Sequence, residues 1–100
     1  MMRNMWTWGG AYFGHFKGED LWTHAGKHAG KLEGREIFDM NGHYLGELKR
    51  NRLVTDLSKK SKQGTPFTPR VKHAGHIPFI KFSGHIMLTG YEDFPGPEKF

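Results

Sequence analysis

Residues 26 to 41 read Gly-Lys-His-Ala-Gly-Lys-Leu-Glu-Gly-Arg-Glu-Ile-Phe-Asp-Met-Asn, and Gly42 begins a further copy of the same pattern. Similar residues recur at a constant spacing of 16 positions. The recurring sets are Gly10/Gly26/Gly42, Gly14/Gly30/Gly46, Phe16/Leu32/Leu48, Leu21/Ile37/Leu53 and Trp22/Phe38/Val54. One step of the same length back from Leu21 and Trp22 reaches Met5 and Trp6. A repeat of this length indicates that the fold is built from copies of one small unit.

Each repeat predicts a β-hairpin. Asn41-Gly42 is a dipeptide favoured in type I′ turns, and Gly18-Glu19 and Gly34-Arg35 suit turns with glycine at the first central position. The segments between these turns are about four to seven residues long, which is typical of strands and too short for helices. Strand alternation predicts that Tyr12, Gly14 and Phe16 share an apolar face, while Phe13, His15 and Lys17 lie on the opposite face.

Two features of the repeat predict how the hairpins pack. Glycine inside a strand costs stability, so its recurrence at 14, 30 and 46 predicts a close approach by a neighbouring backbone or side chain. The second strands, Leu21-Trp22, Ile37-Phe38 and Leu53-Val54, are apolar on both faces. We therefore expect each of them to be sandwiched or to have one face over a cavity.

The ends of the chain are predicted to close the sheet into a ring. Residues 5–7 match only the second strand of a unit, so their partner has to come from elsewhere. Residues 72–77 repeat the pattern of residues 27–32 almost residue for residue, and residues 82–88 are a competing candidate. Closure by either segment would remove exposed sheet edges.

The whole chain, residues 1–100, is therefore predicted to be one all-β domain, a shallow barrel of about four β-hairpin repeats with pseudo-four-fold symmetry, closed by pairing of N- and C-terminal strands. One hundred residues are enough for one hydrophobic core. The predicted parts are repeats at about 5–9, 10–25, 26–41 and 42–55, a basic loop insertion at 56–71, and closing strands and tail at 72–100.

The hydrophobic pair, short turn and Gly-x-hydrophobic-hydrophobic-Gly-x-hydrophobic pattern resembles the bacterial four-fold beta-flower domain. The resemblance covers Met5 to about Thr55 well and Lys72 to Phe94 loosely. It implies four hairpins arranged like petals around a pseudo-four-fold axis in a shallow barrel, and it offers no catalytic residues to carry over. The run Asp39-Met40-Asn41-Gly42-His43-Tyr44-Leu45-Gly46 is also similar to PRC-barrel-like domains, although the period that extends back to Met5 favours the flower.

Composition excludes several classes of function. The chain has no cysteine, so it has no disulfide, no thiolate nucleophile and no sulfur-ligated zinc. No apolar run approaches the roughly 20 residues of a transmembrane helix, and the N-terminal residues have no signal-peptide core. We expect a cytoplasmic protein. The formal net charge of +5 is compatible with nucleic acid, acidic lipid head groups or an acidic protein as a partner.

No pattern in the sequence predicts an enzyme, a metal site or a cofactor. His73 and His76 form an H-x-x-H pair, but residues three apart on a strand point to opposite faces. The serines lie outside any nucleophile-elbow pattern, and no phosphate-loop spacing occurs. We predict no catalytic residue, no metal ligand and no cofactor.

Two hypotheses for function remain. The first is a non-catalytic binding or interaction module that holds a small hydrophobic or lipid-like ligand, or a partner protein, on an aromatic face lined by Trp6, Trp22, Phe38 and Tyr44. The alternative is binding of nucleic acid or another anionic phosphate through Lys59, Lys60, Lys62, Arg70 and Lys72. A homo-oligomer is also left open, because both faces of some strands are apolar.

Overall fold

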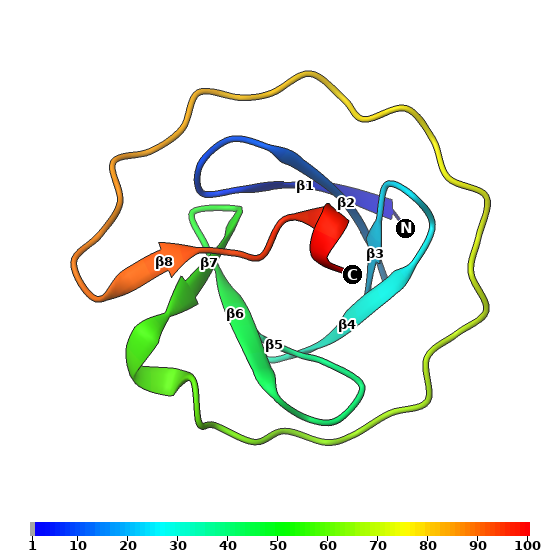
Figure 1. Cartoon of the computed structure of the whole chain (residues 1–100), viewed down its shortest axis with the longest axis horizontal. Helices are drawn as coiled ribbons and strands as arrows, with labels where there is room; N and C mark the ends of the chain where they lie inside the picture. The colour runs from blue at the N-terminus through cyan, green and yellow to red at the C-terminus, as the bar shows by residue number, and fades with distance from the viewer. Residues whose placement is uncertain (1) are drawn as a thin grey trace.

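A computed structural model describes residues 2–100 and confirms an all-β chain (Figure 1). The strands, in chain order, are β1 (Met2–Thr7), β2 (Tyr12–Lys17), β3 (Asp20–Thr23), β4 (His28–Glu33), β5 (Glu36–Phe38), β6 (Tyr44–Lys49), β7 (Arg52–Asp56) and β8 (Tyr91–Asp93). Two 3-10 turns follow β7 and β8, η1 (Leu57–Lys59) and η2 (Pro97–Lys99). Strands β1 to β7 form a closed barrel, and β8 is added outside it along β7.

The barrel closes where β1 meets β7 in parallel, with Trp6 opposite Arg52. The prediction that residues 72–77 or 82–88 close the ring is therefore wrong, since neither segment forms a strand. The repeats supply three complete hairpins, β2–β3, β4–β5 and β6–β7, and β1 is a lone strand. Because the barrel has an odd number of strands, each antiparallel to the next, the strands that meet at the seam run in the same direction.

A β-bulge recurs at equivalent positions of the repeat and changes the predicted alternation. The register shifts between Met5 and Trp6, and it shifts again at the matching step of β3 and of β5. Met5 faces Gly14 and Trp6 faces Tyr12, so Phe13 is an extra residue on its strand. Tyr12 thus turns outward and Phe13 turns into the core, which overturns the prediction that Tyr12 and Phe16 share a face. Bulges also bend the strands, as a narrow barrel requires.

The repeat separates inner from outer side chains. Four side chains with no exposed surface fill the barrel interior at one repeat position, Met5, Leu21, Ile37 and Leu53. The residues that follow three of them, Trp22, Phe38 and Val54, are also buried, so both faces of these strands are covered and the prediction that they are sandwiched is confirmed. The close approach predicted at the glycine inside the first strand of each repeat is confirmed, because a Cβ on Gly14 would lie 1.9 Å from the Trp22 carbonyl oxygen.

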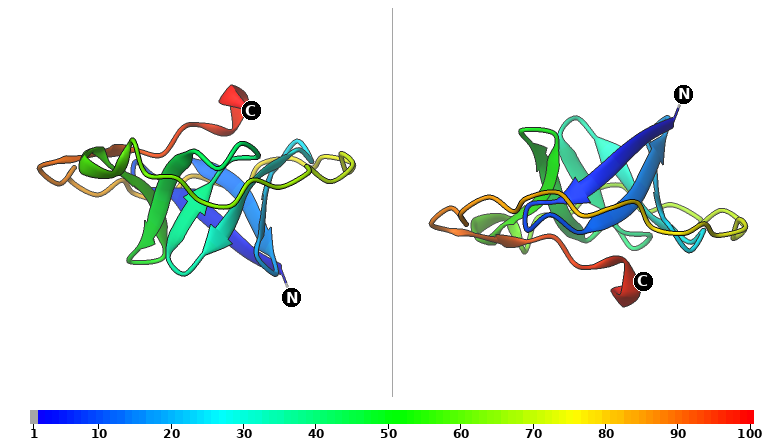
Figure 2. Two further views of the ribbon diagram at one scale, coloured as in Figure 1. Left: turned by 90° about the horizontal axis from the view of Figure 1, so that it is seen from below. Right: turned by 90° about the horizontal axis from the view of Figure 1, so that it is seen from above.

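An extended segment, residues 64–89, encircles the barrel, and we call it the strap (Figure 1). Viewed edge-on it is a narrow band near one end of the barrel (Figure 2). Its backbone N–H groups donate to carbonyls of the three repeated turns: His85 to Trp8, Phe82 to Gly10, His76 to His24, His73 to Gly26, Phe67 to Met40 and Gly64 to Gly42, at 2.7 to 3.0 Å. Each turn of the repeat therefore supplies two acceptors, and the paired donors recur at every ninth position of the strap.

The strap has a three-residue side-chain period. Six strap side chains contact aromatic rings of the barrel: Phe67, His73, His76, Phe79, Phe82 and His85. The large hydrophobic side chains of the strap most exposed to solvent are Val71, Ile77, Ile80 and Ile86. All separations within each set are multiples of three, which is the period of a polyproline-II chain. Such a chain makes no internal hydrogen bonds, so its N–H groups are available to the turns. This period explains why the strap wraps the barrel and does not join the sheet.

The C-terminal segment crosses the end of the barrel nearest the strap (Figures 1 and 2). Phe94 is buried and meets the Phe13 ring edge-on, with centroids 5.4 Å apart. Phe100 meets the same ring at 5.5 Å and is partly buried against the core. Apolar side chains of the tail therefore cover one end of the core, and η2 lies over the barrel mouth.

Candidate functional site

The two tryptophans proposed as ligand contacts lie on the outer wall of the barrel under different parts of the strap. Trp6 stacks on Phe82 with ring centroids 3.9 Å apart, and its indole N–H donates to the Ile80 carbonyl at 3.0 Å. Trp22 is 1% exposed and lies with its ring centroid 4.0 Å from that of His73. The strap thus occupies the surfaces on which these tryptophans would hold a ligand.

The other two proposed ligand contacts are neighbours. Phe38 and Tyr44 lie edge to face with centroids 6.1 Å apart, and Phe38 packs against the backbone of Gly64. The Tyr44 hydroxyl donates to Glu47 at 2.8 Å and accepts from the Asp56 amide at 3.1 Å. Burial raises the pKa of Tyr44, so this phenol stays neutral. The structure brings Phe38 and Tyr44 together but places Trp6 and Trp22 in separate sectors.

The cations proposed to bind phosphate are mostly paired with carboxylates. The pairs are Lys59–Glu36 (3.0 Å), Lys59–Glu47 (2.9 Å), Lys60–Glu92 (2.6 Å), Lys62–Glu36 (2.7 Å) and Arg70–Asp20 (2.7 Å). Hydrogen bonds from Lys62 and Lys59 hold the pKa of Glu36 below its usual value. Within residues 2–100, Lys72 is the one cation of the five without a carboxylate within 4 Å.

Arg70 ties the strap to the barrel through two hydrogen bonds. Its backbone N–H donates to His28 Nδ1 at 2.9 Å, while its Nε donates to Asp20 Oδ2 at 2.7 Å. With Nδ1 accepting, the neutral His28 ring carries its proton on Nε2, which faces Asp20 Oδ1 at 3.1 Å. Burial lowers the pKa of His28 and outweighs the opposing effect of the Asp20 charge. His28 therefore holds the strap on the barrel in its neutral form, as an acceptor for the Arg70 backbone N–H.

The H-x-x-H pair, His73 and His76, lies in a histidine-rich sector where the strap crosses β2 and the turn before β4. His76 contacts Tyr12, with Nε2 3.2 Å from the hydroxyl, and its ring centroid is 5.9 Å from that of His15. Burial lowers the pKa of His15, and the charges of His76 and His73 lower it further. Across residues 2–100, no group of three or more His, Cys, Asp or Glu side chains is arranged to hold a metal ion.

Two adjoining clefts flank Phe100 at the barrel mouth, and together we call them the mouth groove. Their volumes are about 450 and 460 Å³, and they share Lys27, His28, Met40 and Phe100. The remaining lining residues are Thr23, Ala25, Ala29, Asp39, Asn41, Leu45, Pro69, Arg70, Lys72, Pro95, Pro97 and Lys99. Both volumes fall in the range of small-molecule sites.

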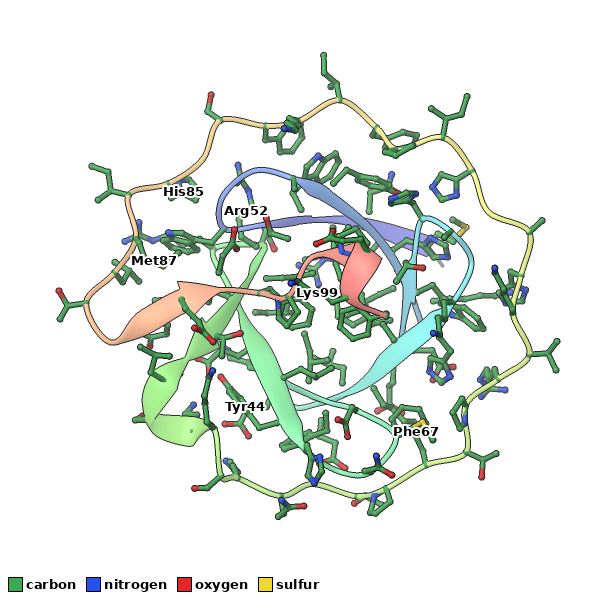
Figure 3. All side chains as sticks on the ribbon, in the orientation of Figure 1. Tyr44, Arg52, Phe67, His85, Met87 and Lys99 are labelled. Atoms are coloured by element: carbon green, nitrogen blue, oxygen red, sulfur yellow. The ribbon has the colours of Figure 1, made fainter. Side chains whose placement is uncertain are left out.

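The mouth groove has an apolar lining and a basic rim. Ala29 and Leu45 supply aliphatic surface beside Phe100, and the flexible Met40 side chain is 48% exposed. In the described part of the chain, Lys27, Lys72 and Lys99 have no carboxylate within 4 Å. Figure 3 shows Lys99 over the centre of the barrel end. The groove therefore combines apolar contact surface with three lysines that form no ion pair among the described residues. It also contains one carboxylate side chain, Asp39, which accepts hydrogen bonds from the Asn41 and His43 backbone N–H groups.

Sequence reasoning missed most of this groove. Lys27 and Met40 lie in successive turns of the repeat, and the path of the C-terminal segment brings Lys99 and Phe100, distant in the chain, beside them. One usable signal was the nine-residue spacing of His76 and His85 with Phe67, which identifies the strap. No local pattern marks the groove itself, since its walls come from three strands (β3, β4 and β6), two turns, the strap and the tail.

Comparison with protein-family models, with curated proteins and with solved structures finds no match to this chain. Within the described residues, no helix is long and apolar enough to cross a membrane. The site has to be interpreted from its own geometry and charge.

Proposed function

We propose that this protein is a non-catalytic binding module that holds an amphipathic anion, with an apolar body and a carboxylate or phosphate head, in the mouth groove. The observation that carries the proposal is the pair of adjoining clefts that share Lys27, Met40 and Phe100. The ligand class unites the hydrophobic ligand and the anionic partner predicted from the sequence. Of the residues predicted for either, only Arg70 and Lys72 line the groove.

Each part of such a ligand has a matching surface. An alkyl chain gains free energy by covering apolar area, which Ala29, Leu45 and the Phe100 ring supply. Lys27 lines both clefts, so a head group in either of them lies near its ammonium group. Met40 has an unbranched, adaptable side chain that can follow ligands of different shape. These features support a lipid-like ligand of modest size.

Isothermal titration calorimetry with dodecanoate tests the proposal, with dodecanol and inorganic phosphate as partial ligands. We expect dodecanoate to bind more tightly than either, because dodecanol lacks the anionic head group and inorganic phosphate lacks the apolar body. Lys27→Ala is expected to weaken dodecanoate binding about two- to five-fold, the usual effect of one exposed ion pair. Met40→Asp places a like charge and a polar group on the apolar lining, and we expect it to abolish binding.

Lys17→Ala is the matched control, because Lys17 is an exposed lysine at the end of β2 and does not line the groove. Equal dodecanoate affinity for wild type, Lys27→Ala and Met40→Asp would overturn the proposal, as would the absence of any heat of binding. Circular dichroism checks that Met40→Asp is folded, and Met40→Gln provides a milder change at the same site.

The alternative function, nucleic-acid binding through the cluster at 59–72, stays a prediction. Its support is the basic character of the segment, and the ion pairs of Lys59, Lys60, Lys62 and Arg70 reduce the charge available to phosphates. A labelled single-stranded oligonucleotide at low salt tests it, because phosphate binding weakens steeply as salt rises. The beta-flower resemblance, the cytoplasmic location and the homo-oligomer likewise stay predictions.

A further inference from the structure

The outer side of the strap carries aliphatic side chains that contact little of the rest of the protein. Exposure reaches 86% for Val71 and Ile77, 83% for Ile80 and 93% for Ile86. Single exposed apolar residues are ordinary on protein surfaces, but these recur at multiples of three along one extended segment. Figure 3 shows the outward row of side chains around the rim, whereas Phe67 points from the strap toward the barrel.

Half-exposed aromatic rings lie beside these aliphatic side chains. Phe79 is 48% exposed and Phe82 is 45% exposed, and both contact the Trp6 ring, at 6.4 and 3.9 Å between centroids. Trp6 is itself only partly buried. The arc from Ile77 to Phe82 therefore presents two aliphatic side chains at its outer edge, with an aromatic cluster directly behind them.

The charge of the strap has one sign. From Leu57 to Tyr91 the chain contains no aspartate or glutamate, while it contains six lysine or arginine residues. Four of these, at 59, 60, 62 and 70, pair with carboxylates of the barrel or of β8. The other two, Lys72 and Lys81, have no carboxylate within 4 Å in the described chain. Lys81 lies within the arc, and Lys72 precedes it in the strap. A partner of this surface is thus expected to be negatively charged.

We propose that the arc from Ile77 to Phe82 docks this protein edge-on onto an anionic lipid surface. The two isoleucines enter the head-group region, and Lys81 lies against acidic head groups. The Trp6 ring lies at the interface, where amphipathic aromatic rings are favoured, and Phe79 adds apolar area beside it. This surface is separate from the mouth groove, and the inference does not rest on the function proposed for that groove.

The shape of the strap favours a membrane over a rigid partner. The strap is a convex rim and the widest part of the molecule in edge-on view, so a flat surface brought to the rim meets it first (Figure 2). Isolated side chains that project from a convex rim leave gaps between them, which a folded partner could fill only with a matching concave surface. A fluid layer of lipids fills such gaps without shape complementarity.

Vesicle flotation tests the proposal with the whole protein. We expect it to partition onto vesicles of phosphatidylcholine and phosphatidylserine more strongly than onto phosphatidylcholine alone, with a blue shift in tryptophan emission. The double variant Ile77→Ser/Ile80→Ser is expected to partition at least about ten-fold more weakly, because it removes most of the inserted apolar area. Lys81→Glu is expected to weaken partitioning about five-fold or more, since one lysine near an acidic surface contributes a factor of that order.

The matched control is Met2→Ser/Leu57→Ser, which changes two exposed apolar residues, 60% and 44% accessible, that lie off the arc. Partitioning by this control but not by Ile77→Ser/Ile80→Ser would support the proposal, and dodecanoate binding by both variants would show that the mouth groove is intact. Several outcomes would overturn it: no partitioning of the wild type, equal partitioning of the arc variant, or a dimer in sedimentation analysis that only the arc variant dissociates. Binding of RNA in place of vesicles would overturn it as well.

Discussion

Gly26→Ala is expected to loosen the strap from the barrel. Gly26 has φ of +91°, and its carbonyl accepts the His73 N–H at 2.8 Å. A Cβ at this position would lie 2.0 Å from the His73 carbonyl oxygen, a backbone atom, so the strap has to move away. The movement breaks the hydrogen bond and separates His73 from the Trp22 ring.

The size of the effect follows from these contacts. An L-residue with positive φ costs about 1–2 kcal/mol. Loss of the hydrogen bond costs about 0.5–1.5 kcal/mol, and loss of the ring contact at 4.0 Å costs a similar amount. Gly26→Ala should therefore lower the free energy of unfolding by about 2–5 kcal/mol, less the small gain from restricting the unfolded chain.

Gly34→Ala is the matched control. Gly34 has φ of +63°, and a Cβ built there meets nothing within 4 Å, so it carries only the backbone cost. Urea unfolding followed by tryptophan fluorescence should give a difference of about 1–3 kcal/mol between the variants, the part due to the strap. Trypsin should also cleave after Lys72 and Lys81 faster in Gly26→Ala. Equal stability and equal cleavage of the two variants would refute the role of this turn in holding the strap.

Two further predictions concern charge. Burial lowers the pKa of His15 and of His28 below the unfolded value of about 6.5. The stabilisation that these two neutral rings contribute is therefore fully present above that pH, and it is lost as the pH falls through the lowered folded-state values. The urea midpoint should fall between pH about 7.5 and about 5.5, and a midpoint that rises on acidification would contradict this assignment. Lys59→Ala should lower the free energy of unfolding by about 1 kcal/mol, because it removes two ion pairs at once and leaves Glu36 paired only with Lys62. Lys60→Ala removes one exposed pair and should change this free energy by less than about 0.5 kcal/mol. Equal effects of these two variants in low-salt urea unfolding would argue against a structural role for the Lys59 pairs.

The hairpins were predictable because their signals are local. Glycines with positive φ, Gly18 and Gly34, lie in two of the three hairpin turns, and the third turn has Arg50 and Asn51 at positive φ. These turns and the apolar residues at fixed distances act within one repeat unit, whatever the rest of the chain does. The alternation in the first strand of each unit was harder to predict. Phe13 and Tyr12 exchange faces because of a bulge, and a bulge depends on the register between two strands.

The order of residues in the chain determines the repeat, the strands, the buried set from Met5 to Leu53 and the close approach at the recurrent glycines. Only the tertiary structure decides the closure of the barrel, the path of the strap around it, and the groove lined by Lys27, Met40 and Phe100. The difference lies in the range of the interactions. Backbone turns and side-chain alternation act between residues a few positions apart. Closure and the groove depend on contacts between segments far apart in the chain, whose geometry is set only when the whole chain packs.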